Sequence, residues 1–145
     1  MRKSKSFRYL LIAVAMMLIL GACSSDSGSS GGGGEKKKDA KDIEVVFIPK
    51  MTGNAFFESG NDGAQEMGKK VGFKVKYDGA PEGTVANQVQ IINSAVNSGA
   101  DAIAISSVSS DGLNQALKKA LDAGVKVVTW DSDVDPEFRS VYVNQ

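Results

Sequence analysis

Apolar and polar residues alternate in blocks along most of the chain, and the blocks switch between two periods. Short apolar runs predict strands at 43–49, 73–77, 102–105, 126–130 and 140–143. Longer stripes with the helical period predict helices at 56–71, 85–98 and 113–123. Strands that alternate with helices are typical of β-α-β crossovers, which build a parallel sheet covered by helices on both faces. The pattern therefore predicts an α/β fold with a doubly wound parallel sheet.

The expected helix ends carry their own signals. Gly72, Gly99 and Gly124 each stand after a helical stripe and directly before an apolar run. Glycine at this place permits the left-handed turn that ends a helix. Thr84 is expected to cap the start of the second helix, and Asp111 or a nearby serine the start of the third. These signals agree with the strand pattern and support the same architecture.

The N-terminal segment follows a different pattern. Residues 1–8 are basic and contain no acidic residue, residues 9–20 are mostly apolar, and Gly21 and Ala22 follow. A basic start, a short apolar core and small residues at the end are typical of a secretory signal peptide. The apolar run is shorter than the roughly 20 residues that span a bilayer. We therefore favour a cleaved signal peptide at 1–22 over an uncleaved membrane anchor.

The next segment, 23–41, begins with Cys23 and continues with Ser, Gly, Asp, Glu and Lys. Such a composition cannot bury enough apolar surface to offset the entropy lost on ordering, so we expect a flexible linker. Cys23 is the only cysteine, which excludes an intrachain disulfide. A buried free thiol is the ordinary alternative, but no apolar neighbours stand beside Cys23 to bury it. The predicted folded domain is 42–145.

Composition excludes several kinds of chemistry. The chain has 17 basic and 17 acidic side chains and no histidine. The part after the signal peptide is acidic, which argues against a nucleic-acid partner, and the lack of histidine excludes His-based triads and most zinc sites. The series Asp131, Asp133 and Asp135 begins like a calcium loop, but Pro136 and Tyr142 stand where that loop needs Gly and Glu. We expect no metal and no cofactor.

Polar residues follow the predicted strands, where an open parallel sheet binds its ligands. Lys50 follows the first strand and is either a donor to a ligand oxygen or an ordinary surface lysine. Asp131 follows the fourth strand and either accepts from two adjacent sugar hydroxyls or caps a turn. Ser107 adds a hydroxyl after the third strand. One of Phe56 and Phe57 is expected in the core and the other over the mouth of the site, unless both are core residues.

Six short segments, taken together, resemble a known family: 45–50, 56–57, 62–64, 77–79, 108–113 and 127–133. They look like the periplasmic sugar-binding proteins of the ribose-binding class, and within it like the branch of autoinducer-2 receptors and rhamnose-binding proteins. The resemblance implies the strand order 2-1-3-4-5. It also implies ligand contacts from Lys50 and Asp131, and from an Asn54-x-Phe56-Phe57 motif that supplies a hydrogen bond and ring stacking. Ser132 replaces an arginine typical of ribose binders, which favours the other branch.

The resemblance further implies a receptor for an ABC importer, in which two similar lobes close on a small sugar or sugar-like ligand. The partner would be the ABC permease. Leu20-Gly21-Ala22-Cys23 resembles the lipobox of bacterial lipoproteins, in which the cysteine carries acyl chains such as palmitate. This implies an exported protein anchored to the outer face of the cell membrane, where more than one acyl chain gives a stable attachment.

The family normally has two lobes, and this sequence stops where the resemblance places the first crossing between them. We therefore expect the N-terminal lobe alone, as a fragment or a natural truncation, with weak or no sugar binding by itself. A sensor that presents ligand to a membrane receptor is the alternative role. An exported α/β hydrolase is less favoured, because histidine and a nucleophile-elbow motif are both absent from the sequence. The ligand stays open between autoinducer-2, rhamnose, ribose and other small sugars.

Overall fold

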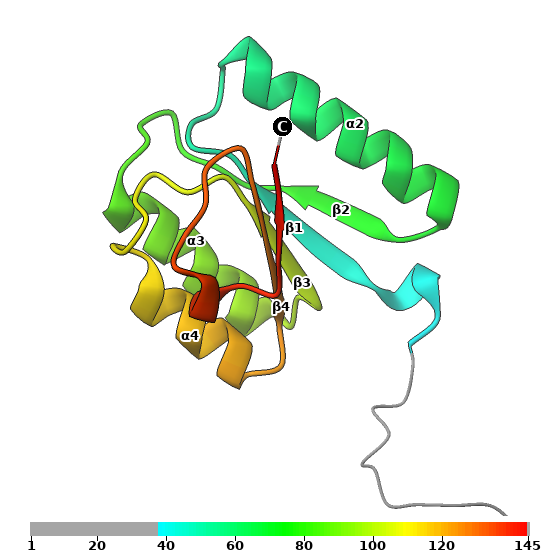
Figure 1. The fold of residues 1–145 in the computed structure, drawn as a ribbon. Helices are drawn as coiled ribbons and strands as arrows, with labels where there is room; N and C mark the ends of the chain where they lie inside the picture. Colours follow the sequence, from blue (N-terminus) through cyan, green and yellow to red (C-terminus); the bar gives the residue numbers. More distant parts are fainter. Residues whose placement is uncertain (1–37, 145) are drawn as a thin grey trace, which may run out of the picture. The chain divides into compact units, whose positions relative to one another are not determined.

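The computed structural model describes residues 38–144, which form one parallel sheet with helices on both faces (Figure 1). All of them belong to a compact unit that spans Lys36–Gln145. The elements are η1 (Ala40–Asp42), β1 (Glu44–Ile48), α2 (Ala55–Val71), β2 (Lys74–Tyr77), α3 (Val85–Ser98), β3 (Ala102–Ile105), α4 (Asn114–Asp122), β4 (Lys126–Trp130), η2 (Pro136–Phe138) and β5 (Val141–Val143). The order β2-β1-β3-β4-β5 confirms the predicted α/β class and strand order.

The predicted signal peptide, Cys23 and most of the predicted linker lie outside the described residues. Regular structure begins within the linker's last residues, because Ala40–Asp42 form a 3-10 turn. Lys38 lies beside this turn, and its Nζ is 2.5 Å from a carboxylate oxygen of Asp101. None of the helices in residues 38–144 has the length and apolar character needed to cross a bilayer.

The central strands end side by side at one edge of the sheet. Ile48 of β1 pairs with Ile105 of β3, and Ile105 pairs with Thr129 of β4, all in parallel. Because the strands share one direction, the residues that follow them leave the sheet at the same edge. Lys50 and Asp131 are thus brought to a common edge although they are far apart in the sequence.

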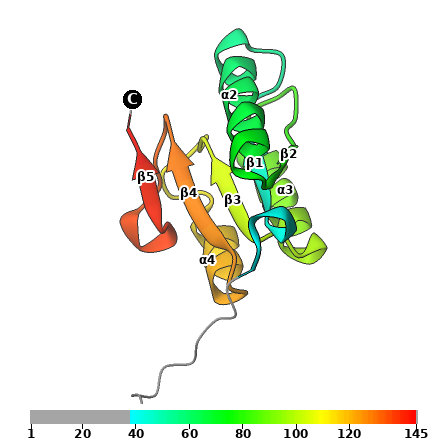
Figure 2. The ribbon, with the colours of Figure 1, turned by 90° about the vertical axis from the view of Figure 1, so that its right-hand side faces the viewer.

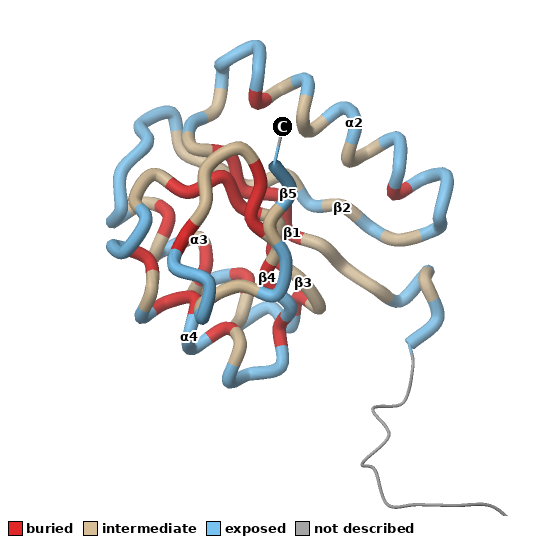
Figure 3. The backbone as a smooth tube through the Cα atoms, in the orientation of Figure 1, coloured by how far each residue is buried: buried red, intermediate tan, exposed pale blue. Residues whose placement is uncertain are grey.

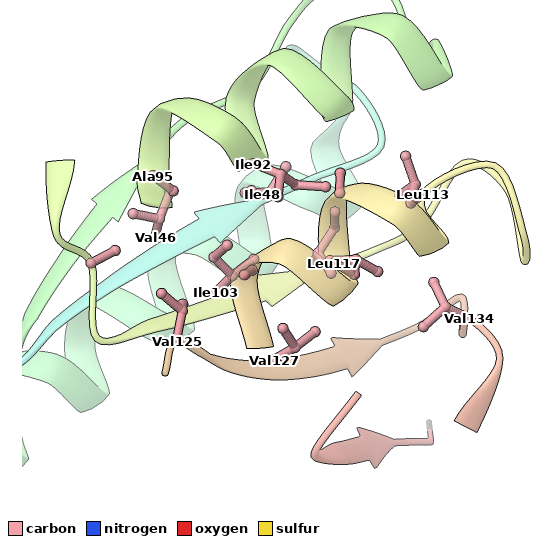
Figure 4. Packing of buried hydrophobic residues seen from close by; sticks show 14 residues of the cluster. Val46, Ile48, Ile92, Ala95, Ile103, Leu113, Leu117, Val125, Val127 and Val134 are labelled. Carbon is pink, nitrogen blue, oxygen red and sulfur yellow. The ribbon is translucent and has the colours of Figure 1, made fainter. Parts of the chain in front are cut away.

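The larger hydrophobic core lies between the sheet and the pair α3 and α4 (Figure 4). Successive side chains of a strand face opposite sides of the sheet, so alternate residues of β1, β3 and β4 point into this core. Figure 3 shows the buried positions concentrated on the central strands β1, β3 and β4 and on α3 and α4. The buried members are Val46, Ile48, Ile92, Ala95, Ala100, Ile103, Ile105, Leu113, Ala116, Leu117, Ala120, Val125, Val127 and Val134. Each large aliphatic side chain buried here stabilises the fold by about 1.5–3 kcal/mol.

The opposite face of the sheet carries α2, on the other side from α3 and α4 (Figures 1 and 2). Under it Phe47, Phe57 and Trp130 form a second, aromatic cluster. The helix lies close to β2 because Gly68 has no side chain: a Cβ atom there would be 2.9 Å from the carbonyl oxygen of Phe73. This cluster ties the first helix to the strand that precedes Asp131.

The predicted glycine ends of α2 and α3 and the predicted Thr84 cap are confirmed, and Asn54 adds a cap that was not predicted. Asn54 caps α2, since its side-chain oxygen accepts a hydrogen bond from Phe56 N at 3.0 Å. Thr84 caps α3 in the same way through Asn87 N at 3.2 Å. Gly72 and Gly99 follow the two helices with positive φ, which glycine adopts without strain.

The predicted cap of α4 is wrong. The residue before the helix is Leu113, and no side chain among the described residues caps this end. Asp111 and Ser109 act earlier, in the turn that leads into the helix: Ser109 Oγ accepts from Gly112 N at 3.0 Å and donates to Asp111 Oδ1 at 2.9 Å. At the other end the helix ends at Asp122, Ala123 is its C-cap residue, and Gly124 follows with φ of 85°.

Candidate functional site

A lysine and an aspartate from different strand ends meet at the carboxyl edge of the sheet. Lys50 follows β1 and Asp131 follows β4, and Lys50 Nζ lies 3.1 Å from Asp131 Oδ2. Their side chains keep 29% and 27% of their surface exposed. The pair is therefore accessible to a ligand, while each charge is compensated in the free protein. The structure brings together the two residues on which the sequence places most weight.

Serine hydroxyls complete this pair. Ser106 Oγ donates to Asp131 Oδ2 at 2.7 Å, and Ser132 Oγ accepts from Lys50 Nζ. Burial alone would raise the pKa of Asp131, but the hydrogen bonds from Ser106 and Lys50 outweigh it, so the pKa lies below its ordinary value. Asp131 is therefore ionised at neutral pH and acts as an acceptor of hydrogen bonds.

The backbone at Asp131 is unusual. Its φ is 59°, and it is the one residue other than glycine with a positive φ within 38–144. The left-handed region is costly for most side chains, although aspartate tolerates it better than most. The hydroxyl of Tyr142, on β5, donates to the carbonyl oxygen of Asp131 at 3.2 Å and supports this conformation. The turn aims the carboxylate at Lys50 rather than along the strand.

The two phenylalanines divide as expected, one inside and one outside. Phe57 is 6% exposed and belongs to the aromatic cluster, whereas Phe56 is 47% exposed. The Phe56 ring packs edge-on against Phe57 at 5.2 Å and stacks on Trp130 at 6.1 Å. An exposed aromatic face is thus held by the residue that directly precedes Asp131.

Two other predicted site residues have their groups engaged within the protein. The amide oxygen of Asn54 caps α2. Ser107 is 3% exposed, and its hydroxyl donates to the carbonyl oxygen of Ser109 and accepts from the Ser109 amide at 3.2 Å. In this structure both groups hydrogen-bond the backbone of loops near the Lys50–Asp131 pair, and a ligand contact from either residue stays a prediction.

An open depression of about 470 Å³ lies beside the pair. Its size falls in the range of small-molecule sites. Asp131 is bonded to two of its lining residues, Lys50 and Ser132. The lining consists of Lys50, Met51, Gly83, Ser107, Val108, Ser109, Ser110, Ser132 and Asp133. Hydroxyl, ammonium and carboxylate groups in such a depression suit a small ligand with several oxygen atoms.

Asp133 belongs to the framework of this edge. It accepts from Thr129 Oγ1 at 2.5 Å, and Arg139 Nε lies 2.8 Å from its Oδ1. Burial would raise the pKa of Asp133, but these partners and the Val134 amide hold it below the ordinary value. Within residues 38–144 no group of three or more His, Cys, Asp or Glu side chains is placed to hold a metal ion.

The sequence places Ser106 and Ser132 after the third and fourth strands without a site role for either, and sequence reasoning missed Gln88 altogether. Gln88, on α3, is 2% exposed and hydrogen-bonded to the loops after β1 and β3. It stands three residues after Val85 and four before Ile92, in the apolar stripe of its helix. A polar residue within an apolar stripe is the signal that could have revealed it, because buried polar groups need partners.

Comparison with known proteins identifies the family. Residues 45–145 match the family described as the periplasmic binding protein domain. The chain belongs to this family. It is 33% identical over 96 residues to the D-ribose/D-allose-binding protein of Pseudomonas aeruginosa, an alignment that covers 64% of this chain and 30% of that protein. The predicted family resemblance is thereby confirmed.

Solved structures of periplasmic binding proteins have the same fold. LsrB from Clostridium saccharobutylicum, in complex with AI-2, matches with a TM-score of 0.70 and 56% identity over 71% of this chain and 32% of its own. A solute-binding protein from Clostridium phytofermentas, with bound L-rhamnose, matches with a TM-score of 0.68 and 31% identity over 71% and 32%. The chain thus spans about a third of the length of these relatives. They are solute-binding proteins, not enzymes.

Proposed function

We propose that this chain forms part of the ligand site of an ABC-importer solute-binding protein that captures a small sugar or a sugar-like ligand. The observation that carries the proposal is the Lys50–Asp131 pair at the carboxyl edge of the sheet. The family of the chain and the sugars named for its relatives support this class of ligand.

The chemistry of the pair suits a polyhydroxylated ligand. The ionised Asp131 carboxylate can accept hydrogen bonds from two neighbouring hydroxyls, and Lys50 can donate to a hydroxyl or carbonyl oxygen. In the free protein the two groups satisfy each other, so a ligand would exchange their mutual contact for its own oxygens. The exposed face of Phe56 can cover the apolar side of a ring or carbon chain.

Among the candidate ligands we favour one related to AI-2, with rhamnose next. Of the AI-2 complex and the L-rhamnose complex, the protein with AI-2 is the more similar in sequence. At position 132 a serine hydroxyl accepts from Lys50, and no arginine is available there to bind a ribose. The serine at position 132 therefore supports a ligand that is bound by a lysine and an aspartate, and not one that is bound by an aspartate–arginine pair.

We also propose that the protein is exported and held at the outer face of the membrane by acyl chains on Cys23, next to an ABC permease. The lipobox-like segment Leu20–Cys23 supports this anchor. Labelling of expressing cells with an alkyne-tagged palmitate should mark the protein, and Cys23→Ser should abolish the mark. Equal labelling of the variant would refute the anchor.

The site assignment is tested with four single variants in residues 36–145, the compact unit that contains the whole described core. Ligand titrations followed by NMR detect weak binding. Lys50→Ala and Asp131→Ala should each weaken binding of AI-2 or L-rhamnose at least about tenfold, the effect of losing one charged hydrogen bond. Lys118→Ala and Asp122→Ala remove an exposed ion pair on α4 and serve as matched controls. Unchanged binding in both site variants would show that the assignment is wrong.

A further inference from the structure

The side chain of Gln88 connects two loops of the site from inside the protein. From α3, its Nε2 donates to the carbonyl oxygens of Pro49 at 3.0 Å and Ser106 at 2.8 Å. Its Oε1 accepts from the Val108 amide at 3.0 Å. With 2% of its surface exposed, Gln88 makes these bonds without competition from water. One amide group therefore satisfies three backbone groups that have left the sheet.

These three backbone groups adjoin the residues of the ligand site. The carbonyl of Pro49 directly precedes Lys50, so the first bond fixes the start of the β1 loop. Ser106 offers its carbonyl to Gln88 and its hydroxyl to Asp131, at 2.7 Å. Gln88 thus reaches each member of the Lys50–Asp131 pair through one intermediate residue, Pro49 or Ser106, although it touches neither charged side chain.

The chemistry of a primary amide is needed for this role. A glutamine side chain carries two N–H donors and one carbonyl acceptor at its end. A carboxylate of the same length has no donor for the two carbonyls, and an apolar side chain has neither donor nor acceptor. The sheet cannot replace these bonds, because β1 and β3 end at Ile48 and Ile105.

We propose that Gln88 is a positioning residue, which holds the loops after β1 and β3 at the separation that lets Lys50 and Ser106 bond Asp131 together. The proposal rests on the proposed function only in that it treats this edge as the ligand site. Its geometric content concerns the charged pair and can be measured without any ligand.

The test is the titration of the Asp131 carboxyl group, followed by carboxyl-carbon NMR in residues 36–145. Gln88→Met keeps the length of the side chain and removes its donors and acceptor. The loops then lose the Gln88 bonds and keep the backbone bond from Ser106 N to Ile48 O. The bonds from Ser106 and Lys50 to Asp131 weaken, and the midpoint of the Asp131 titration rises by about 0.5 pH or more. Ligand affinity, measured separately, should fall about tenfold or more, as expected for misplaced binding groups.

The matched control is Gln65→Met. Gln65 lies on α2, and its Nε2 donates to the carbonyl oxygen of Val75 at 3.2 Å, on the other face of the sheet. This variant also removes a bond between helix and strand backbone, so it shows what a merely structural loss does to Asp131. The midpoint should stay at its original value in the control. A rise below about 0.5 pH in Gln88→Met, or an equal rise in the control, overturns the proposal.

The unmodified protein provides a second measurement that does not depend on how well the variant folds. Protonation of Asp131 weakens the hydrogen bond that it accepts from Ser106, and the change should reach the amide of Gln88 through the Ser106 carbonyl. The chemical shift of the Gln88 side-chain 15N should therefore change with pH at the same midpoint as the Asp131 carboxyl group. A 15N shift that does not change across this titration contradicts the proposal. A protein that binds no sugar but shows this coupling would refute the proposed function and leave the role of Gln88 intact.

Discussion

On the proposed function, Lys50 and Asp131 are binding groups that are already arranged before the ligand arrives. Both side chains are partly exposed, and each is bonded to the other and to a serine hydroxyl. A partly exposed ion pair contributes little to stability, about 0–1 kcal/mol. The pair therefore contributes little to folding, which agrees with the proposed role of these two partly exposed charges in binding.

Phe56 and Phe57 allow a role in binding to be distinguished from a role in folding. Phe57→Ala should lower the free energy of unfolding by about 3–5 kcal/mol, because it opens a cavity in the aromatic cluster. Phe56→Ala should cost less than about 1.5 kcal/mol, because nearly half of this ring is exposed. Urea unfolding measures both values, and ligand titration should show the larger loss of affinity for Phe56→Ala. Equal stability losses would contradict the assigned roles.

At the scale of helices and strands, most of the structure could be predicted because each element has its own period and end signals. Buried strands and amphipathic helices bury their apolar faces, so the pattern in the sequence follows the packing. The start of α4 could not be predicted in this way. Serine and aspartate can bond the backbone of a turn as well as that of a helix, and Ser109 here bonds the turn.

The two helix starts provide a direct comparison. Thr84→Ala removes the cap of α3 and should cost about 1 kcal/mol in free energy of unfolding. Asp111→Ala removes no cap from α4 and should change stability by less than about 0.5 kcal/mol. Thermal or urea unfolding distinguishes the two variants. A larger loss for Asp111→Ala than for Thr84→Ala would mean that Asp111 does stabilise the start of α4.

Part of the site was beyond prediction for a related reason. Lys50 and Asp131 could be placed together, because parallel strands bring their carboxyl ends to one edge. Gln88 and Ser106 act through buried contacts between a helix and two loops. The polar position in the apolar stripe of α3 marks Gln88 as buried, but the pattern does not identify its partners. The sequence also does not predict that Asn54 and Ser107 hydrogen-bond the backbone of neighbouring residues in this structure.

At the scale of the whole molecule, the site occupies one edge of a chain that spans about a third of its relatives' length. The depression at this edge is open, whereas small-molecule sites usually bury most of the ligand. We therefore expect residues 36–145 to bind ligand weakly, with a Kd well above the micromolar range, and calorimetry that gave micromolar affinity would contradict this expectation.

The carboxyl groups also determine how the whole fold responds to acid. The pKa of Asp101 lies below its ordinary value because Lys38 and the Glu44 amide donate to it, and the pKa values of Asp131 and Asp133 are lowered by hydrogen bonds that outweigh burial. A lowered folded-state pKa gives stability that is present above the unfolded pKa and lost as pH falls through the folded one.

Stability should therefore be nearly constant from about pH 7 to about pH 5 and fall below about pH 4. The measurement is the urea midpoint as a function of pH. Asp101→Asn should make the acid decline shallower, because it removes one of the three groups that must be protonated. A protein that became more stable between about pH 4 and about pH 2 would contradict this sign.

The most direct test of the central claim is an NMR titration of 15N-labelled residues 36–145 with AI-2 and, separately, L-rhamnose. The account predicts saturable shifts of backbone amides in the loops after β1, β3 and β4, including those of Lys50, Ser106 and Asp131. The amide signals on the exposed side of α4 should stay unchanged. Shifts that were absent at millimolar ligand, or that lay away from this edge of the sheet, would contradict it.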